Sequence, residues 1–406
     1  MTDAPPATAP RSSPLAVPAW AAFLGSSWTW CIGMFLPVIL VRDYGVWGWV
    51  TFAVPNVLGA AAMGWVLRDG QSERMVPAHR PALVAFSVVT AAFQVFFALW
   101  MLPQLGLPKL QWATLAAGAV LVWVGGRWQQ WPHLVLAGAA LLASVVAWVA
   151  AGRSGELLSP VRLWTTDAGR FPPDLALLAP VMAFGFAFCP YLDLTFHRAR
   201  QQTRGAHARA AFSLGFGVLF LAMIVFTLYY AVPVSRHLTD PSLIGQALLT
   251  AVGLHMLGQL AFTIGAHWRD AARTIRFGDA VVPLASVALG VVAWLASTAI
   301  DYPAADPART TARVTFGGGE LVYLLFMSFY GLAFPAYAWL CITPTWRAPT
   351  PPDRRAWATF AVVVLIAAPM YWMGFVERET TWLLPALAVV LLARLATRRP
   401  PNGARG

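Results

Sequence analysis

Apolar runs about as long as a membrane is thick follow one another along the chain, separated by short polar or Pro/Gly-rich segments. A bilayer core of about 30 Å needs about 20 apolar residues in a helix that rises about 1.5 Å per residue. By this measure the sequence predicts twelve transmembrane helices, the fourth run being short. The runs cover residues 17–40, 47–67, 82–102, 111–126, 132–151, 175–196, 208–232, 243–266, 280–299, 319–343, 356–375 and 380–396.

The composition supports this pattern and excludes a soluble globular protein. Hydrophobic residues make up 59% of the 406 residues and charged residues 11%, whereas soluble domains carry about 25% charged residues. We therefore predict an all-α integral membrane protein surrounded by membrane lipid. The formal net charge of +11 does not indicate a nucleic-acid partner, because the arginines lie between the apolar runs instead of along one face.

The sequence gives no sign of an enzyme or a metal protein. Cys31, Cys189 and Cys341 are isolated within apolar runs, so neither a disulfide framework nor a zinc cluster is predicted. The sequence contains no nucleotide-binding glycine loop, catalytic triad or HExxH motif. We therefore predict no catalytic residue, no metal and no cofactor.

The basic residues predict the orientation in the membrane. A cytoplasmic N-terminus places nineteen of the 28 basic residues on the cytoplasmic side, where arginine and lysine are enriched. The even number of spans then makes both termini cytoplasmic. Lys109 is the only lysine, which hints at a GC-rich bacterial genome, so the expected location is a bacterial inner membrane.

Two runs contain residues that interrupt a membrane helix. The first includes "GSSWTWCIGMFLP", with Gly25 and Gly33, and the sixth includes "GFAFCPYLDLTF", with Gly185 and Pro190. Because the sixth span begins a second set of five, the two five-helix sets enter the membrane from opposite sides. Interrupted helices in matching positions of two such halves indicate a transporter site between the breaks. The alternative is close helix packing, since glycine and proline are common in membrane helices.

This reading divides the chain into a core and accessory parts. Residues 15–344 form a ten-helix transporter core, a five-plus-five inverted repeat with halves of about 15–152 and 174–344. Residues 345–397 add two accessory transmembrane helices. The expected cytoplasmic tails are residues 1–14, rich in Pro, Ala and Ser and predicted to be disordered, and residues 398–406.

Several segments resemble the sodium/solute symporter family, whose members have the leucine-transporter type of inverted-repeat fold. "GFAFCPYLDLTF" followed by "HARAAFSLGFGVLFLAM" is similar to the sixth and seventh core helices of that family. "LTAVGLHMLGQLAFTIGAHWRD" resembles its eighth core helix and "FMSFYGLAFPAYAWL" its tenth. The resemblance covers about two-thirds of the chain and implies a secondary transporter that moves a small solute by alternating access.

The chain departs from the family at residues that matter for ion coupling. The family's glutamine before the proline is Cys189 here, and its following arginine is Thr195. Its sodium-binding hydroxyl pair on the eighth helix aligns with Leu254 and His255, which offer sodium no hard oxygen ligand. A proton carried between Asp193 and His255 is therefore favoured at least as much as a sodium ion.

The breaks in the first and sixth spans supply the candidate site. Asp193 is the foremost residue, because a charge at a helix centre costs about 2.5–3.5 kcal/mol and usually serves a function or is paired. The candidate ion-coupling residues are Asp193, His255 and Gln259. The candidate solute-binding residues are Ser26, Ser27, Trp28, Thr29, Trp30, Phe188, Cys189, Tyr191 and Asp193.

Two alternatives stay open at this point. Asp193 can instead lie near the cytoplasmic surface and pair with Arg198 or Arg200, and His255 can be an ordinary hydrogen-bond partner between helices. At the level of function, the rival to a transporter is a symporter-like membrane sensor, which binds a ligand without moving it. An integral-membrane transferase that uses His255 is a third option, for which no second catalytic residue is identified.

Overall fold

The structure is a computed structural model that describes residues 16–108, 111–128, 130–160, 171–276, 278–302 and 315–397. The tails predicted at residues 1–14 and 398–406 lie outside the described residues. Every regular element in the described ranges is helical. Nine of these helices are long and apolar enough to cross a membrane, and two shorter apolar helices, Gln111–Gly125 and Thr380–Leu392, accompany them. The chain is a multi-pass membrane protein.

The helices follow the predicted spans closely. Helix α2 contains the second half of the first span and the whole of the second, joined at Gly45, which has a left-handed backbone (φ 62°) and bends the helix. The tenth span runs from α14 to η5 without interruption. The elements are α1 Ala16–Trp28, α2 Cys31–Val66, α3 Gln71–Ala78, α4 Arg80–Gln104, α5 Gln111–Trp128, α6 Trp131–Arg153, α8 Pro173–Phe188, η1 Cys189–Leu192, α9 Leu194–Gln202, α10 Gly205–Leu214, η2 Gly215–Phe220, α11 Leu221–Thr239, α12 Gln246–Ala272, α13 Gly278–Ala299, α14 Gly317–Ser328, η3 Phe329–Ala333, α15 Phe334–Tyr337, η4 Ala338–Ile342, η5 Thr343–Thr345, α16 Arg354–Phe375, η6 Thr380–Trp382, α17 Leu383–Leu392 and α18 Arg394–Thr397.

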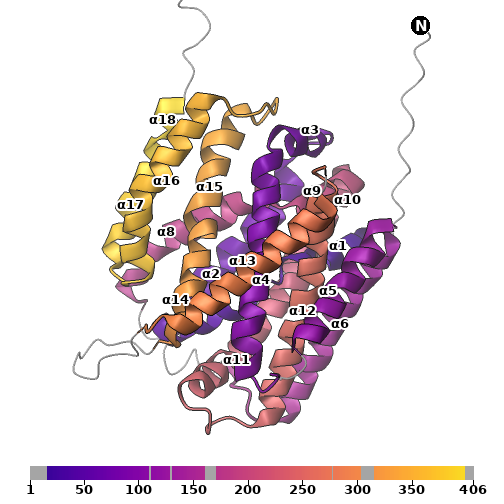
Figure 1. The fold of residues 1–406 in the computed structure, drawn as a ribbon, viewed down its shortest axis with the longest axis vertical. Coiled ribbons are helices and arrows are strands. Elements are labelled where there is room, and N and C mark those ends of the chain that lie inside the picture. Colours follow the sequence, from indigo (N-terminus) through magenta and orange to yellow (C-terminus); the bar gives the residue numbers. More distant parts are fainter. Residues whose placement is uncertain are drawn as a thin grey trace, which may run out of the picture.

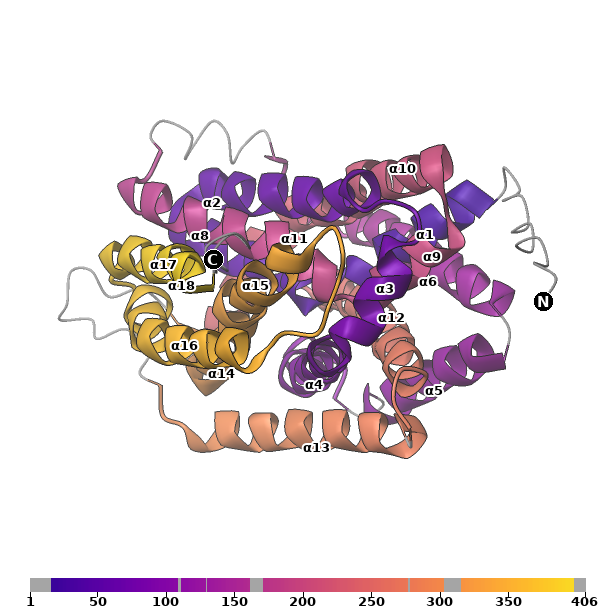
Figure 2. The ribbon, with the colours of Figure 1, turned by 90° about the horizontal axis from the view of Figure 1, so that it is seen from above.

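The bundle has a buried centre, and its outer faces expose apolar side chains. Helix α4 lies in the middle, whereas α13 and the α16–α17 pair lie at the periphery (Figures 1 and 2). Leu142, Leu284 and Leu365 on the outer helices expose 64%, 68% and 74% of their surface, as expected for side chains that face lipid. Helices α3 and α18 lie at the same end of the bundle, here called the α3 end (Figure 1). The opposite end, here called the Arg378 end, carries the loop from α16 to η6.

The first and sixth spans are both interrupted. Helix α1 ends at Trp28, and α2 begins at Cys31 after Trp30 adopts an extended backbone (φ −88°, ψ 175°). Helix α8 ends at Phe188, one 3₁₀ turn follows, and the extended residue Asp193 (φ −81°, ψ 112°) starts α9. The predicted pair of broken helices is therefore present.

Local hydrogen bonds explain why the first span breaks where it does. The hydroxyl of Thr29 donates to the Gly25 carbonyl at 2.7 Å, and the indole of Trp30 donates to the Ser27 carbonyl. Side chains that bond nearby carbonyls in this way compete with the helical backbone ladder. The amide of Cys31, at the start of α2, donates a hydrogen bond to Oε1 of Gln94 on α4 at 3.1 Å, which caps α2.

The predicted helix-breaking glycines have a different role. Gly25 and Gly33 lie within α1 and α2, and Gly185 lies within α8, so the breaks fall elsewhere. A Cβ on Gly25 would lie 3.3 Å from the Gly215 carbonyl oxygen, and one on Gly185 would lie 2.9 Å from the Tyr330 carbonyl oxygen. These glycines allow neighbouring helices to approach closely. Pro190 alone of the four lies at a break, inside η1.

The tight contact between α2 and α8 gives a stability prediction. A Cβ on Gly59 would lie 2.2 Å from the carbonyl oxygen of Phe186, so Gly59→Ala must displace backbone. We expect this substitution to lower the free energy of unfolding by about 1–3 kcal/mol. The measurement is thermal unfolding of the purified protein in detergent.

Gly138 on α6 is the matched control, because nothing lies within 4 Å of a Cβ placed there. Gly138→Ala should leave stability unchanged or raise it by up to about 1 kcal/mol through helix propensity. Equal unfolding temperatures for the two variants would contradict the close contact of α2 with α8.

Candidate functional site

A small cavity lies between the two breaks. Four aromatic rings contribute to its wall, and the centres of the Trp28 and Trp30 rings are 4.4 Å apart. Asn56 accepts a hydrogen bond from the indole of Trp28 at 2.7 Å, and the Cys189 thiol donates to the Tyr330 carbonyl at 3.2 Å. The lining residues are Trp28, Trp30, Ile32, Gly33, Asn56, Phe186, Cys189 and Tyr330.

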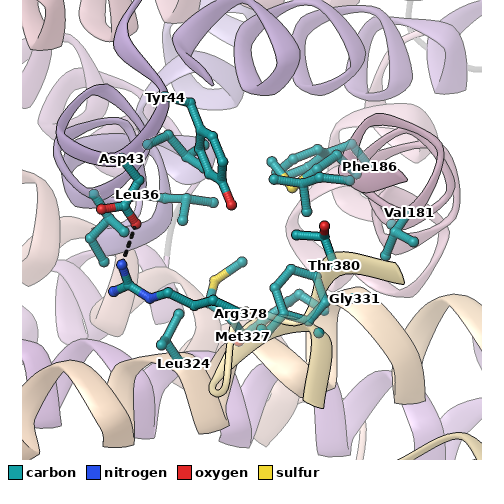
Figure 3. A pocket seen from close by; sticks show the side chains of 18 of the residues that line it. Leu36, Asp43, Tyr44, Val181, Phe186, Leu324, Met327, Gly331, Arg378 and Thr380 are labelled. Atoms are coloured by element: carbon teal, nitrogen blue, oxygen red, sulfur yellow. Dashed lines mark ion pairs between the residues drawn. The ribbon is translucent and has the colours of Figure 1, made fainter. Parts of the chain in front are cut away.

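A larger vestibule leads from the Arg378 end toward this cavity (Figure 3). It lies between the first half of α2, α8, α14 and the end of α16, and has about 60 Å³ of space for water-sized molecules. Phe186 and Tyr330 line both the vestibule and the small cavity. These two rings therefore separate a solvent-accessible entrance from the space between the broken helices.

Four charged residues form an ion-pair network beside the vestibule, here called the mouth network: Arg42, Asp43, Glu320 and Arg378. Both terminal nitrogens of Arg42 lie 2.7 Å from the carboxylate oxygens of Glu320, which is fully buried. Arg378 reaches across from the α16–η6 loop, 2.7 Å from Glu320 and 3.0 Å from Asp43 (Figure 3). The network ties together three walls of the vestibule.

Asp193 is completely buried at the second break. Its Oδ1 accepts hydrogen bonds from the amide and the hydroxyl of Thr195, both at 2.7 Å, and so caps the N-terminus of α9. Its Oδ2 has no hydrogen-bond partner among the described residues, and the nearest cationic candidate is Nε2 of His267 at 4.0 Å. The carboxylate is thus only half satisfied.

The alternative partners of Asp193 are engaged elsewhere. Arg198 lies 3.5 Å from Asp270 of α12, and Arg200 lies 2.7 Å from Asp69 in the α2–α3 linker. Burial acts to raise the pKa of Asp69, but the hydrogen bonds from Arg200 and the Gly205 amide and nearby arginine charges hold that pKa below its usual value. The break at Asp193 therefore does not form the surface ion pair considered from the sequence.

His267 completes the surroundings of Asp193 and was not singled out from the sequence. Its Nδ1 lies 3.1 Å from the Ser87 hydroxyl of α4, and its ring centre lies 5.6 Å from that of Trp30. Sequence analysis gave no reason to choose it, because it precedes the charged end of its span. Only the packing of α12 against α4 and α9 places it beside the second break.

His255 and Gln259 lie away from Asp193, between α12 and α6. Nδ1 of His255 and Nε2 of Gln259 each lie 2.8 Å from the Ser144 hydroxyl. The described contacts of Asp193 are with Thr195 and His267, so a direct Asp193–His255 pair is not formed. This arrangement agrees with the alternative that His255 bonds between helices.

The rotation of α12 expected from the resemblance, with Leu254 and His255 facing the first span, is wrong for Leu254. Leu254, aligned with the sodium-binding hydroxyl pair, is 51% exposed and cannot face the first span. The α12 residue that does so is Thr263, whose hydroxyl lies 3.5 Å from the Ser26 carbonyl oxygen. A helix with apolar residues on most faces offers little sequence signal for its rotation, so the alignment missed this position.

The other predicted site residues divide between the cavity and the packing around it. The hydroxyls of Ser26 and Ser27 donate to the carbonyls of Ala137 (2.9 Å) and Leu24 (3.2 Å). Phe188 packs against Trp339 with ring centres 5.6 Å apart, and Tyr191 packs against Trp346 at 4.7 Å. Of the predicted solute-binding residues, the structure places Trp28, Trp30 and Cys189 in the cavity wall.

The α3 end of the site is closed by contacts around Arg198. Its guanidinium lies 5.0 Å from the ring centre of Phe23 on α1, and its Nη1 lies 2.5 Å from Nδ1 of His133 on α6. With the ion pair to Asp270, one arginine of α9 joins α1, α6 and α12. On its outer side Arg198 lines an open polar hollow of about 220 Å³ together with His197, Arg269 and Asp270.

Within the described ranges, no group of three or more His, Cys, Asp or Glu side chains is placed to hold a metal ion. Cys31, Asp193, His267 and Cys189 are residues of metal-ligand type near the breaks. Asp193 and His267 are 4.0 Å apart, and the Cys189 thiol is directed at a backbone carbonyl. The site residues therefore do not form a side-chain metal cage.

Comparison with solved structures identifies the architecture. The chain is similar to crystal structures of the Eremococcus coleocola manganese transporter, in a histidine-to-alanine mutant (TM-score 0.52, 14% identity, 96% of this chain and 97% of that chain) and a glutamate-to-glutamine mutant (0.50, 13%, 97% and 98%). The fold is that of a membrane transporter. At this identity the likeness concerns the fold alone. No protein-family model matches the sequence, and the search of characterised proteins gives no match.

Proposed function

We propose that this protein is a secondary transporter that carries a small solute by alternating access. The observation that supports this most directly is the small cavity between two broken helices, with the larger vestibule on its Arg378 side. Broken helices near the middle of the membrane are tolerated where they line such a cavity. The two sets of five spans would form the inverted-repeat core, residues 15–344, with residues 345–397 accessory, as in leucine-transporter-type proteins.

The site favours an organic solute over a divalent metal. The cavity has an aromatic wall of two tryptophans, Phe186 and Tyr330, which suits the flat or apolar part of a solute. The manganese transporter shares the fold, but the residues described here form no three-ligand metal group. An amino acid, sugar, vitamin or nucleobase agrees with these walls and a single carboxylate.

We further propose that Asp193 carries the coupling charge. A buried carboxylate with one unpartnered oxygen and only a histidine nearby is costly in a membrane unless a proton, cation or cationic group joins it. A proton is favoured, because it needs only the unpartnered oxygen of Asp193, whereas a sodium ion needs several oxygen ligands gathered around it. The α3 end would be cytoplasmic, with both termini there, in a bacterial inner membrane.

The test is a two-step binding and transport experiment. Purified protein is first melted with a panel of small metabolites, with and without sodium and at two pH values. A solute at about one hundred times its dissociation constant should add about 2.7 kcal/mol of stability. The stabilising solute is then used in counterflow with proteoliposomes, where exchange of labelled for unlabelled solute indicates transport. Binding without counterflow would instead indicate a membrane sensor.

A further inference from the structure

Helix α12 carries a line of buried polar side chains that the solute site does not use. His255, Gln259, Thr263 and His267 recur every four residues, and each exposes 1% or less of its surface. We call these four residues the α12 stripe. Residues four apart lie on one side of a helix, so the stripe rises about 6 Å per step and about 18 Å in all. That is more than half of a bilayer core of about 30 Å.

The Ser144 hydroxyl joins the first two members of the stripe, the last member lies beside Asp193, and water molecules would have to complete the steps through Thr263. The Ser144 hydroxyl is 2.8 Å from both His255 and Gln259, and Thr263 is 3.5 Å from the Ser26 carbonyl oxygen. At the lower end, Nε2 of His267 is 4.0 Å from Oδ2 of Asp193. The larger separations are of a size that one water molecule bridges between polar partners.

Several atoms of the stripe have no hydrogen-bond partner among the described residues. They are Nε2 of His255, Oε1 of Gln259, Nε2 of His267 and, facing it, Oδ2 of Asp193. Each buried unpartnered polar group costs about 1–3 kcal/mol. Such atoms also occur off the stripe, for example on His79 and His237, so what distinguishes the stripe is their four-residue spacing on a helix that meets Asp193. Groups that exchange hydrogen bonds with water need free donor and acceptor positions.

We infer that the α12 stripe conducts protons between Asp193 and His255, along a route separate from that of the solute. This inference rests on the proposed coupling role of Asp193. In each step a water molecule or imidazole accepts one proton and releases another, so only charge moves and no bond to carbon changes. The titratable groups facing Asp193 are His267, Cys189, Tyr330 and, farther away, Asp270.

The outer end of the stripe is covered by a residue attached to the first broken helix. The rings of Phe226 and Tyr230 lie 5.3 and 6.5 Å from that of His255, and no charged side chain is among its described contacts. The Tyr230 hydroxyl donates to the Met34 carbonyl at 2.7 Å, three residues into α2. Movement of α2 would therefore move the cover of His255.

The experiment measures proton uptake without any solute. Proteoliposomes containing the full chain and a trapped pH-sensitive dye receive an inside-negative potential from a potassium gradient and valinomycin. We expect wild-type protein to acidify the lumen faster than protein-free liposomes. His255→Phe and, independently, Gln259→Leu should reduce the rate to that of protein-free liposomes. His237→Phe, another buried histidine bonded to a backbone carbonyl but off the stripe, should keep the wild-type rate.

The possible results distinguish the proposed proton route along the α12 stripe from the proposed coupling role of Asp193. Wild-type rates in both stripe variants, with uptake lost in Asp193→Asn, would overturn the stripe as the route and leave the role of Asp193 intact. Wild-type rates in all three would overturn both. Absence of uptake by wild-type protein would also overturn both, while a solute that binds and exchanges would still support transport.

Discussion

The Asp193→Asn variant is expected to fold as stably as the wild-type protein and to lose solute transport. An asparagine Oδ1 can accept the same two hydrogen bonds from Thr195, so the cap of α9 is kept. It carries neither charge nor an exchangeable acidic proton. Because Asp193 is not among the residues that line the cavity, the expected loss is one of coupling, and coupled uptake should disappear.

The matched substitution Asp193→Ala separates capping from function. Alanine removes the cap as well as the charge, so it should lose transport and in addition about 0.5–2 kcal/mol of stability. Uptake in proteoliposomes and thermal unfolding are measured on both variants. Normal uptake by Asp193→Asn would mean that the carboxylate serves only as a cap, and the proposed coupling role would then be wrong.

The spans and the breaks could be predicted because both depend on local sequence. A stretch of about 20 apolar residues has few alternatives to a membrane helix, whatever it packs against. The short 3₁₀ turn around Pro190 and the cap by Asp193 follow from the preferences of these two residues alone. The position of the second break could therefore be predicted from local sequence, without knowledge of tertiary contacts.

The partners across the bundle could not be predicted in the same way. His267 lies beside Asp193, and Arg378 beside Glu320, only because helices far apart in the sequence pack together. Membrane helices are apolar on most sides, so hydropathy gives little information on their rotation. This explains why His255, rather than His267, was paired with Asp193 from the sequence.

The regular polar spacing on α12 was a usable signal that hydropathy alone conceals. Three polar side chains at four-residue intervals below His255 share one side of the helix, which identifies its protein-facing side. Once that side is fixed, Leu254 must turn outward, as its 51% exposure confirms. The rotation of a membrane helix about its axis can thus be inferred where polar residues repeat. The residues that contact these polar side chains depend on helix packing and cannot be inferred in this way.

Glu320→Gln should be the most destabilising single change in the mouth network. Glu320 accepts hydrogen bonds from Arg42, from Arg378 and from the Phe316 amide at 2.8 Å, with its side chain fully buried. A neutral amide leaves two arginines, only 10% and 14% exposed, to share Asp43 alone. Removal of one partner from a buried ion pair costs about 3–5 kcal/mol, and we expect a loss of that size in thermal or chemical unfolding.

Two companion variants decide whether this loss arises from the network. Glu377→Gln changes a nearby carboxylate that accepts an exposed hydrogen bond from Trp372, and should alter stability by no more than about 0.5 kcal/mol. The double variant Glu320→Gln/Arg42→Gln should lose less than the sum of its single changes, because it removes a charge together with its counter-charge. If the losses simply add, the carboxylate and guanidinium are not coupled, and the vestibule walls are held together by helix packing alone.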